Sequence, residues 1–130
     1  MDPQVFYGMV RERLGQCDRE EAKRGTAAVF RALRDRLTPD EADQVAAQLP
    51  GPLKAVWSEG EPAERTPLKM DREQFYERVR EDVGLITAQE ARWLTLAVFA
   101  ALKGSLSPGE VEDVMAQLPK DLKEVWVEAV

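Results

Sequence analysis

The sequence contains no histidine and only one cysteine, Cys17, and these shortages exclude much of the chemistry that small proteins use. Histidine is the commonest general base and the commonest nitrogen ligand for metals. Without it, a serine nucleophile lacks its usual base, and a single thiolate cannot complete a structural zinc site. A lone cysteine cannot form a disulfide within the chain, which is typical of a reducing cytoplasm. We therefore expect a cytoplasmic protein that is not an enzyme and that binds neither a metal nor a cofactor.

Long apolar runs and an excess of positive charge are also missing. No stretch approaches the roughly 20 apolar residues of a membrane span. The formal net charge is −6, whereas a general nucleic-acid binder needs a basic surface. The first residues show no basic segment followed by an apolar run, so we expect no secretory signal. These features predict a globular protein that binds neither membranes nor nucleic acids.

The dominant feature of the sequence is an internal repeat. Residues 6–57 align without a gap with residues 75–126, each residue with the one 69 positions later, and about half of the pairs are identical. Phe6 aligns with Phe75 and Trp57 with Trp126. We predict a single domain over residues 1–130, made of two tandem pseudo-symmetric units (1–58 and 71–130) and a linker (59–70). The sequence leaves open whether the units pack within one chain or exchange between two chains.

The local signals are those of helices throughout. Thr38-Pro39-Asp40-Glu41 and Ser107-Pro108-Gly109-Glu110 each place a hydroxyl at a helix N-cap, proline at the first position and glutamate at the third, which predicts a capping box. No segment shows the period-two alternation of a strand. We expect an all-α fold in which each unit has three helices and a short fourth, packed as one helical domain. The expected helices are 3–14, 19–36, 39–48, 51–58, 72–83, 88–104, 108–117 and 120–129.

The repeated motif resembles a known family. Leu-Thr/Ser-Pro-x-Glu, followed by Gln-Leu-Pro-x-x-Leu-Lys-x-x-Trp, occurs at 37–57 and again at 106–126. This composite pattern is similar to the bacterial domain-of-unknown-function family 2267, and the resemblance covers nearly the whole chain. It implies a small all-helical protein with a duplicated unit. It implies no established activity and no catalytic residues.

The two copies differ most in their longest helix. In the first copy this helix has one apolar and one charged face, whereas residues 93–102 of the second copy are apolar almost all round. Arg24 is replaced by Trp93 and Arg31 by Ala100. Because a helix without a polar face needs cover on every side, it is either the central helix of the fold or a contact for another chain. The candidate interface is one large anchor with small residues beside it: Trp93, Leu96, Ala97, Ala100 and Gly104.

Two further groups of side chains are candidate sites. Arg24, Arg31 and Arg34 follow one stripe of the first long helix and could bind a phosphate or carboxylate, although a solvated helix face explains them as well. Cys17 aligns with Ile86, so we interpret both as the apolar residue that packs back before an N-cap, with a redox thiol as the alternative.

The acidic residues after Ser107-Pro108 are a candidate metal site. Glu110, Glu112 and Asp113 could provide oxygen ligands for Mg²⁺ or Ca²⁺. Neighbouring positions of a helix point in different directions, however, and an acidic first turn complements the helix dipole. We therefore predict no metal site here.

These observations favour a non-catalytic protein-interaction or regulatory module. Its partner would be an unidentified protein or a second copy of the chain, and Trp93 is the first residue to test. The alternative is a small-molecule or anion-sensing module, with a pocket between the two units and the three arginines near its mouth.

Overall fold

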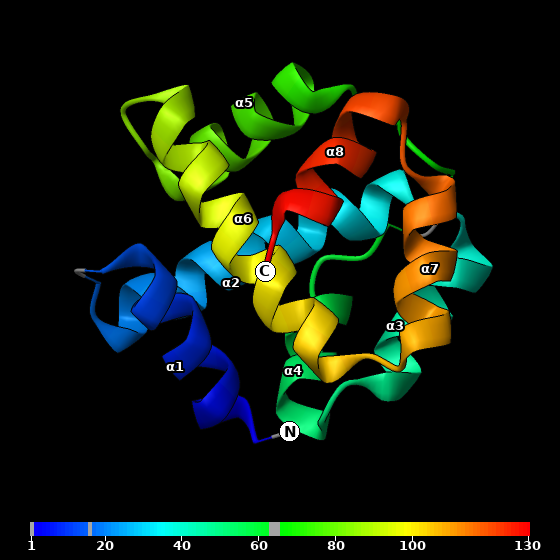
Figure 1. The fold of residues 1–130 in the computed structure, drawn as a ribbon, viewed down its shortest axis with the longest axis horizontal. Helices are drawn as coiled ribbons and strands as arrows, with labels where there is room; N and C mark the ends of the chain where they lie inside the picture. The colour runs from blue at the N-terminus through cyan, green and yellow to red at the C-terminus, as the bar shows by residue number, and fades with distance from the viewer. Residues whose placement is uncertain (1, 16, 63–65) are drawn as a thin grey trace.

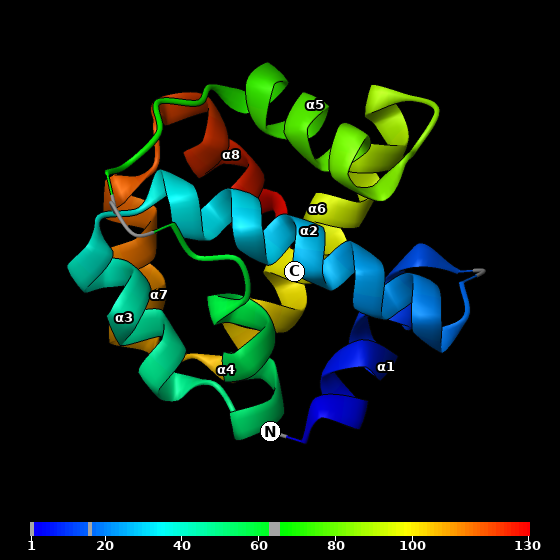
Figure 2. The same cartoon turned by 180° about the vertical axis from the view of Figure 1, so that it is seen from behind.

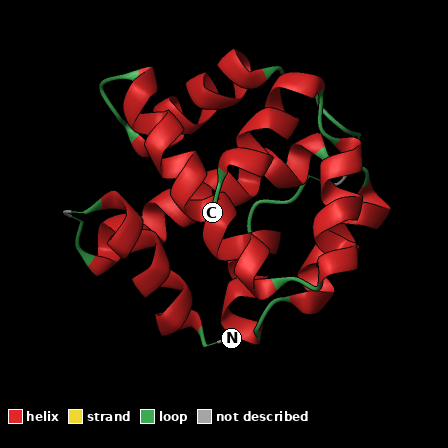
Figure 3. Ribbon diagram, in the orientation of Figure 1, coloured by secondary structure: helices red, strands yellow, loops and turns green. Residues whose placement is uncertain are grey.

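A computed structural model of the chain describes residues 2–15, 17–62 and 66–130, so residues 63–65 of the expected linker lie outside the described residues. The described part forms eight α-helices and no strand (Figures 1 and 3), which confirms the all-α prediction. The helices are α1 (Pro3–Leu14), α2 (Arg19–Arg36), α3 (Pro39–Gln48), α4 (Gly51–Ser58), α5 (Arg72–Val83), α6 (Ala88–Ser105), α7 (Pro108–Gln117) and α8 (Lys120–Glu128). The predicted boundaries agree within about one residue.

Local capping chemistry explains where most helices begin and end. Asp71 with Gln74, and Thr87 with Glu90, form complete capping boxes at the starts of α5 and α6. A side-chain oxygen thereby satisfies a backbone N–H that has no partner in the first turn. Gly84 ends α5 in the left-handed conformation at φ 83°, which costs glycine far less than other residues.

Helix α6 lies at the centre of the fold. It packs against α1, α2, α5 and α8, and α2 crosses it on the face seen in Figure 2. Helix α1 contacts α6 as well as α2, and α5 contacts α2 as well as α6, so the first helix of each half lies against the long helix of the other. The buried apolar side chains form one continuous cluster through both halves.

The same chain of aromatic rings is present in both halves of the core. Phe30 lies between Phe6 and Trp57, with ring centroids 5.6 and 5.3 Å apart in edge-on geometry. The residues 69 positions later repeat this arrangement at 5.8 and 5.0 Å. Edge-on aromatic pairs add about 0.5–1.5 kcal/mol beyond the burial of their surface. Trp57 and Trp126 are buried, and they attach α4 and α8 to the long helices.

The crossing of α2 and α6 explains one difference between the two copies. A Cβ atom at Gly25 would lie 2.6 Å from Cδ1 of Leu94, a distance that side chains do not adopt. Gly25 and Leu94 are aligned positions of the repeat, so at this crossing a residue meets its own counterpart. Two large side chains fit there only if one of them shifts, whereas one glycine and one leucine fit without a shift.

Among the described residues, no single helix is both long enough and apolar enough to cross a bilayer. Helices α5 and α6 reach that length and composition only together, and they are bent by 94° at the break between them.

Candidate functional site

Trp93 stands on the surface between two hollows. Its side chain on α6 is 53% exposed. One hollow, of about 500 Å³, is lined partly by Leu96 and Val130, and the other, of about 430 Å³, partly by Val83 and Leu85. Leu14 and Trp93 line both, so the exposed indole lies between them. These apolar residues, Leu14, Val83, Leu85, Trp93, Leu96 and Val130, are called the Trp93 groove below.

The other residues of the predicted interface are placed differently. Ala97 and Ala100 are 2% and 6% exposed, so the chain itself covers them. Small side chains there suit the close packing of α1 against α6. Leu96 is half-buried beside Trp93, whereas Gly104 is exposed. At 1.5 Å per residue, Gly104 lies roughly 16 Å along the helix from Trp93. Burial inside the fold therefore accounts for the two alanines, and Trp93 and Leu96 are the accessible part of this face.

Arg34 does not belong to an open anion-binding face. It is 4% exposed, and its Nη1 atom donates to the backbone oxygens of Trp57 (3.1 Å) and Glu59 (2.7 Å) at the end of α4. The last carbonyls of a helix lack intrahelical donors and carry partial negative charge, so a buried cation is stabilised there. The guanidinium is thus occupied by the chain's own backbone, which corrects the sequence interpretation.

The repeat contains the signal that could have assigned this role. Lys103 aligns with Arg34, and its Nζ donates to the backbone oxygens of Trp126 and Ala129, each at 2.8 Å, at the end of α8. Burial lowers the pKa of Lys103. A basic side chain at the same position of both copies therefore binds the end of the short fourth helix in each half.

Arg31 is held in a contact between the halves. Its Nε and Nη2 atoms donate to the two carboxylate oxygens of Asp82 on α5, at 2.9 and 3.0 Å. This two-pronged hydrogen bond raises the pKa of Arg31. Arg24 is exposed, and it lines a hollow of about 510 Å³ together with Arg31. Two of the three predicted arginines therefore share a hollow, and Arg34 is elsewhere.

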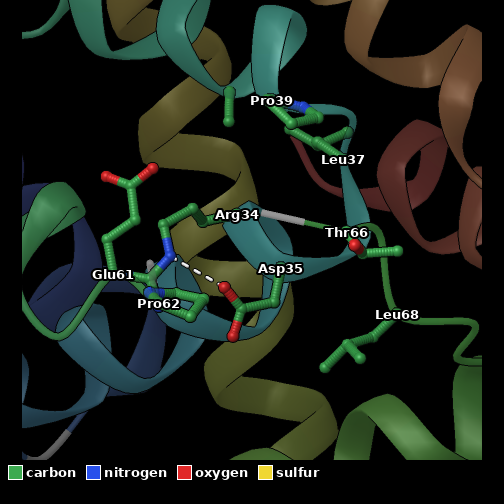
Figure 4. A pocket seen from close by; sticks show the side chains of 9 residues that line it. Arg34, Asp35, Leu37, Pro39, Glu61, Pro62, Thr66 and Leu68 are labelled. Atoms are coloured by element: carbon green, nitrogen blue, oxygen red, sulfur yellow. Dashed lines mark hydrogen bonds and ion pairs between the residues drawn. The ribbon is translucent and has the colours of Figure 1, made fainter. Parts of the chain in front are cut away.

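A further hollow, of about 360 Å³, lies where the linker returns to α2 (Figure 4). Asp35 accepts hydrogen bonds from Arg34 and from Arg78 of α5, while its backbone oxygen accepts from the N–H of Leu68 at 2.7 Å. Burial acts to raise the pKa of Asp35, but the hydrogen bonds from the two arginines outweigh it and lower the pKa. The hydrogen bonds of Asp35 in the wall of this hollow connect α2 with α5 and with the linker.

The capping boxes predicted for α3 and α7 form only in part. The hydroxyls of Thr38 and Ser107 accept from the backbone N–H groups of Glu41 and Glu110, as expected. The backbone N–H groups of the two cap residues do not bind those glutamates. They donate instead to the side-chain oxygens of glutamines from the opposite helix, at 2.9 Å (Thr38 to Gln117) and 2.8 Å (Ser107 to Gln48). The glutamines replace the glutamates in the caps, which corrects that part of the prediction.

Glu41 and Glu110, whose carboxylates do not take part in the caps, lie close together between α3 and α7. Glu41 and Glu110 are 6% and 5% exposed, and with Asp113 they bring three carboxylate oxygens within 4.8 Å of one another. Burial, then the Glu110 carboxylate beside it, then the negative charges of Glu110 and Asp113 raise the pKa of Glu41 to about 8. Sequence reasoning grouped Glu110 and Asp113 with Glu112, which is exposed, and missed Glu41. The signal was again the repeat, because Glu41 and Glu110 are aligned.

Cys17 and its counterpart Ile86 differ in their surroundings. Cys17 is half-buried and packs against the core, and its Sγ donates to the backbone oxygen of Asp18 at 3.3 Å. Burial, followed by the charges of Glu21 and Asp18, raises the pKa of the thiol, which disfavours the reactive thiolate. Ile86 is 87% exposed, so the prediction that it packs back before the N-cap is wrong.

Comparison with known proteins identifies the family of this chain. The family model described as "Uncharacterized conserved protein (DUF2267)" matches residues 4–125. The match extends over nearly the whole chain, so the chain belongs to this family, which confirms the resemblance seen in the repeated motif. No curated protein matches the chain.

Proposed function

We propose that this member of the DUF2267 family is a non-catalytic, cytoplasmic protein-interaction module, and that the Trp93 groove binds a second copy of the same chain. The exposure of Trp93 carries the proposal. The indole is 53% exposed between two hollows whose walls combine apolar and charged side chains, although most of its neighbours on α6 are buried. Tryptophan is enriched among the residues that dominate protein interfaces, and a large aromatic side chain gains most from the removal of water.

Shape favours a second copy as the occupant. In a twofold dimer the same patch lies on both subunits, so the patch must be complementary to itself. An exposed indole beside two hollows meets this condition, because each Trp93 can enter a hollow of the other chain.

Charge favours the same occupant. Both hollows have rims of mixed sign: Arg13 and Glu128 line one, and Arg24 lies with Glu21 and Glu90 in the other. A patch that carries both signs can pair with its own copy, whereas a patch of one sign repels itself.

We also propose that the chain is a single domain of two tandem pseudo-symmetric units. The common offset of the helix starts and the matching aromatic chains support this arrangement. So do the two places where aligned residues meet, Gly25 with Leu94 and Glu41 with Glu110. Under this proposal the Trp93 groove is a specialisation of one unit, because the aligned residue of the other unit is Arg24.

Light scattering over a range of protein concentrations tests the interaction. We expect the wild-type chain to reach the mass of a dimer and Trp93→Glu to stay monomeric. Val5→Glu is the matched control, because Val5 is also 53% exposed and lines neither hollow of the groove. Circular dichroism shows whether each variant is folded. A wild-type chain that stays monomeric at all concentrations, or a folded Trp93→Glu variant that still dimerises, would refute the proposal.

A second candidate function, the sensing of a small anion, is supported by the hollow at Arg24 and Arg31. Four basic side chains line it (Arg19, Lys23, Arg24 and Arg31) against two acidic ones (Glu59 and Asp82). Asp82 comes from α5, whereas the other residues that line the hollow come from the first half of the chain. The hollow therefore lies at the junction of the units. Inorganic phosphate or citrate should raise the melting temperature, and Arg24→Ala should remove the rise. An unchanged melting temperature with both anions would count against this function.

A further inference from the structure

The carboxylate cluster of Glu41, Glu110 and Asp113 lies outside the Trp93 groove, so the proposed interaction does not explain why three acidic side chains are close together. Glu41 comes from α3, Glu110 and Asp113 come from α7, and the two glutamates are at least nine-tenths buried. Among the described residues, Oε1 of Glu41 and Oε1 of Glu110 have no hydrogen-bond partner. One carboxylate oxygen of each glutamate also lies within 4.8 Å of the other and of Asp113, so the buried acceptors are close together.

Such an arrangement requires a positive species. Two buried carboxylates a few ångströms apart repel each other, and a buried charge without a partner is strongly unfavourable. One proton shared by the glutamates would satisfy their two orphan oxygens without Asp113, whose exposed carboxylate is hydrated. A cation would use all three groups, and the exposure of Asp113 gives it a route from solvent.

We propose that Glu41, Glu110 and Asp113 form a binding site for one divalent cation of the Mg²⁺ or Mn²⁺ type. All three ligands are hard oxygen donors, which these cations prefer. Such cations use few protein carboxylates and retain several waters, which suits a site with one exposed edge. The aligned partner of Asp113 is Gln44, so only the second half supplies a third carboxylate.

The surrounding contacts hold the ligands in place without the ion. Gln48 of α3 accepts from the backbone N–H of Ser107 at 2.8 Å, and its Nε2 donates to the Ser107 hydroxyl at 3.3 Å. Gln117 of α7 accepts from the N–H of Thr38 at 2.9 Å. These hydrogen bonds tie α3 to α7 at both ends of the pair, so the cluster is preorganised between them. A bound cation would link the two halves of the chain and stabilise the fold.

Titration with MnCl₂, followed by electron paramagnetic resonance of free Mn²⁺ and by the melting temperature, tests the site. We expect one bound Mn²⁺ per chain, a melting temperature that rises with Mn²⁺, and competition by Mg²⁺. Glu41→Gln and Glu110→Gln keep the side-chain shape and should weaken binding at least about tenfold, the equivalent of roughly 1.4 kcal/mol. Asp113→Asn changes an exposed side chain and should weaken binding without disturbing the fold.

Glu112→Gln is the control, because it removes the same charge from an exposed position of the same helix. It should leave Mn²⁺ binding unchanged. If the folded wild-type chain binds no Mn²⁺ and its melting temperature responds to pH but not to Mn²⁺, the cluster holds a proton only and the proposal is wrong. Equal loss of binding in Glu112→Gln would overturn it as well, because the attraction would then be a general effect of negative charge.

Discussion

An exchange of side chains between Gly25 and Leu94 tests how the two halves meet. The α2–α6 crossing has room for one leucine, because a Cβ atom at Gly25 would lie 2.6 Å from Cδ1 of Leu94. Gly25→Leu should therefore force a displacement that costs about 1–3 kcal/mol, offset by up to about 1 kcal/mol of improved helix propensity. Leu94→Gly removes a side chain that is 6% exposed, at a cost of about 2–5 kcal/mol plus about 1 kcal/mol for glycine inside a helix.

The double variant should recover most of this loss. A leucine at position 25 would fill the space left by the leucine at 94, and the helix-propensity terms of the two changes would cancel. We expect its free energy of unfolding to lie within about 1–2 kcal/mol of the wild-type value, which implies a coupling energy of at least about 1 kcal/mol.

Urea denaturation followed by circular dichroism measures these free energies. Gly8→Leu is the control, because nothing lies within 4 Å of a Cβ atom at that exposed position of α1. It should leave stability unchanged or raise it slightly. If the effects of Gly25→Leu and Leu94→Gly add within about 0.5 kcal/mol, the two side chains do not share one space and the described crossing is wrong.

Two further predictions concern buried carboxylates. Asp35→Asn should lower the free energy of unfolding by about 3–5 kcal/mol at pH 7, because it leaves the 4%-exposed Arg34 beside an uncharged partner. Urea denaturation measures this loss, and a value below about 1 kcal/mol would contradict the role of Asp35. The folded-state pKa of Glu41 is raised from 4.5 to about 8, so between these pH values the folded chain holds a proton that the unfolded chain releases. In buffer with EDTA, stability should therefore fall as pH rises through this range, by up to about 1.4 kcal/mol per pH unit, and Glu41→Gln should flatten the slope. An equal slope in that variant would contradict the assignment.

The elements of the fold were predictable because their signals are local. The capping residues Asp71 and Thr87 lie within a few positions of the helices they start. The core residues Phe30 and Trp57 recur unchanged 69 positions later, so the repeat itself marks them. The same repeat could have assigned Arg34, since a basic residue stands at position 103.

Contacts between the halves were not predictable, because nothing in a local pattern tells which distant segment lies opposite. Arg31 is bound by Asp82, 51 positions away, and only the packing of α2 against α5 brings them together. Sequence chemistry also favoured Glu41 as a capping-box residue. Gln117 fills that place from the opposite helix, and this leaves Glu41 to face Glu110.

The most direct test of the proposed function is fluorine nuclear magnetic resonance of the chain labelled with 5-fluorotryptophan. The sequence has three tryptophans, of which Trp57 and Trp126 are 2% and 1% exposed and Trp93 is 53% exposed. If Trp93 enters a second copy, its resonance should shift with protein concentration, while those of the two buried tryptophans stay constant as internal controls. A Trp93 resonance that does not change from dilute to concentrated protein, and that stays fully accessible to a soluble paramagnetic quencher, would contradict self-association through this groove.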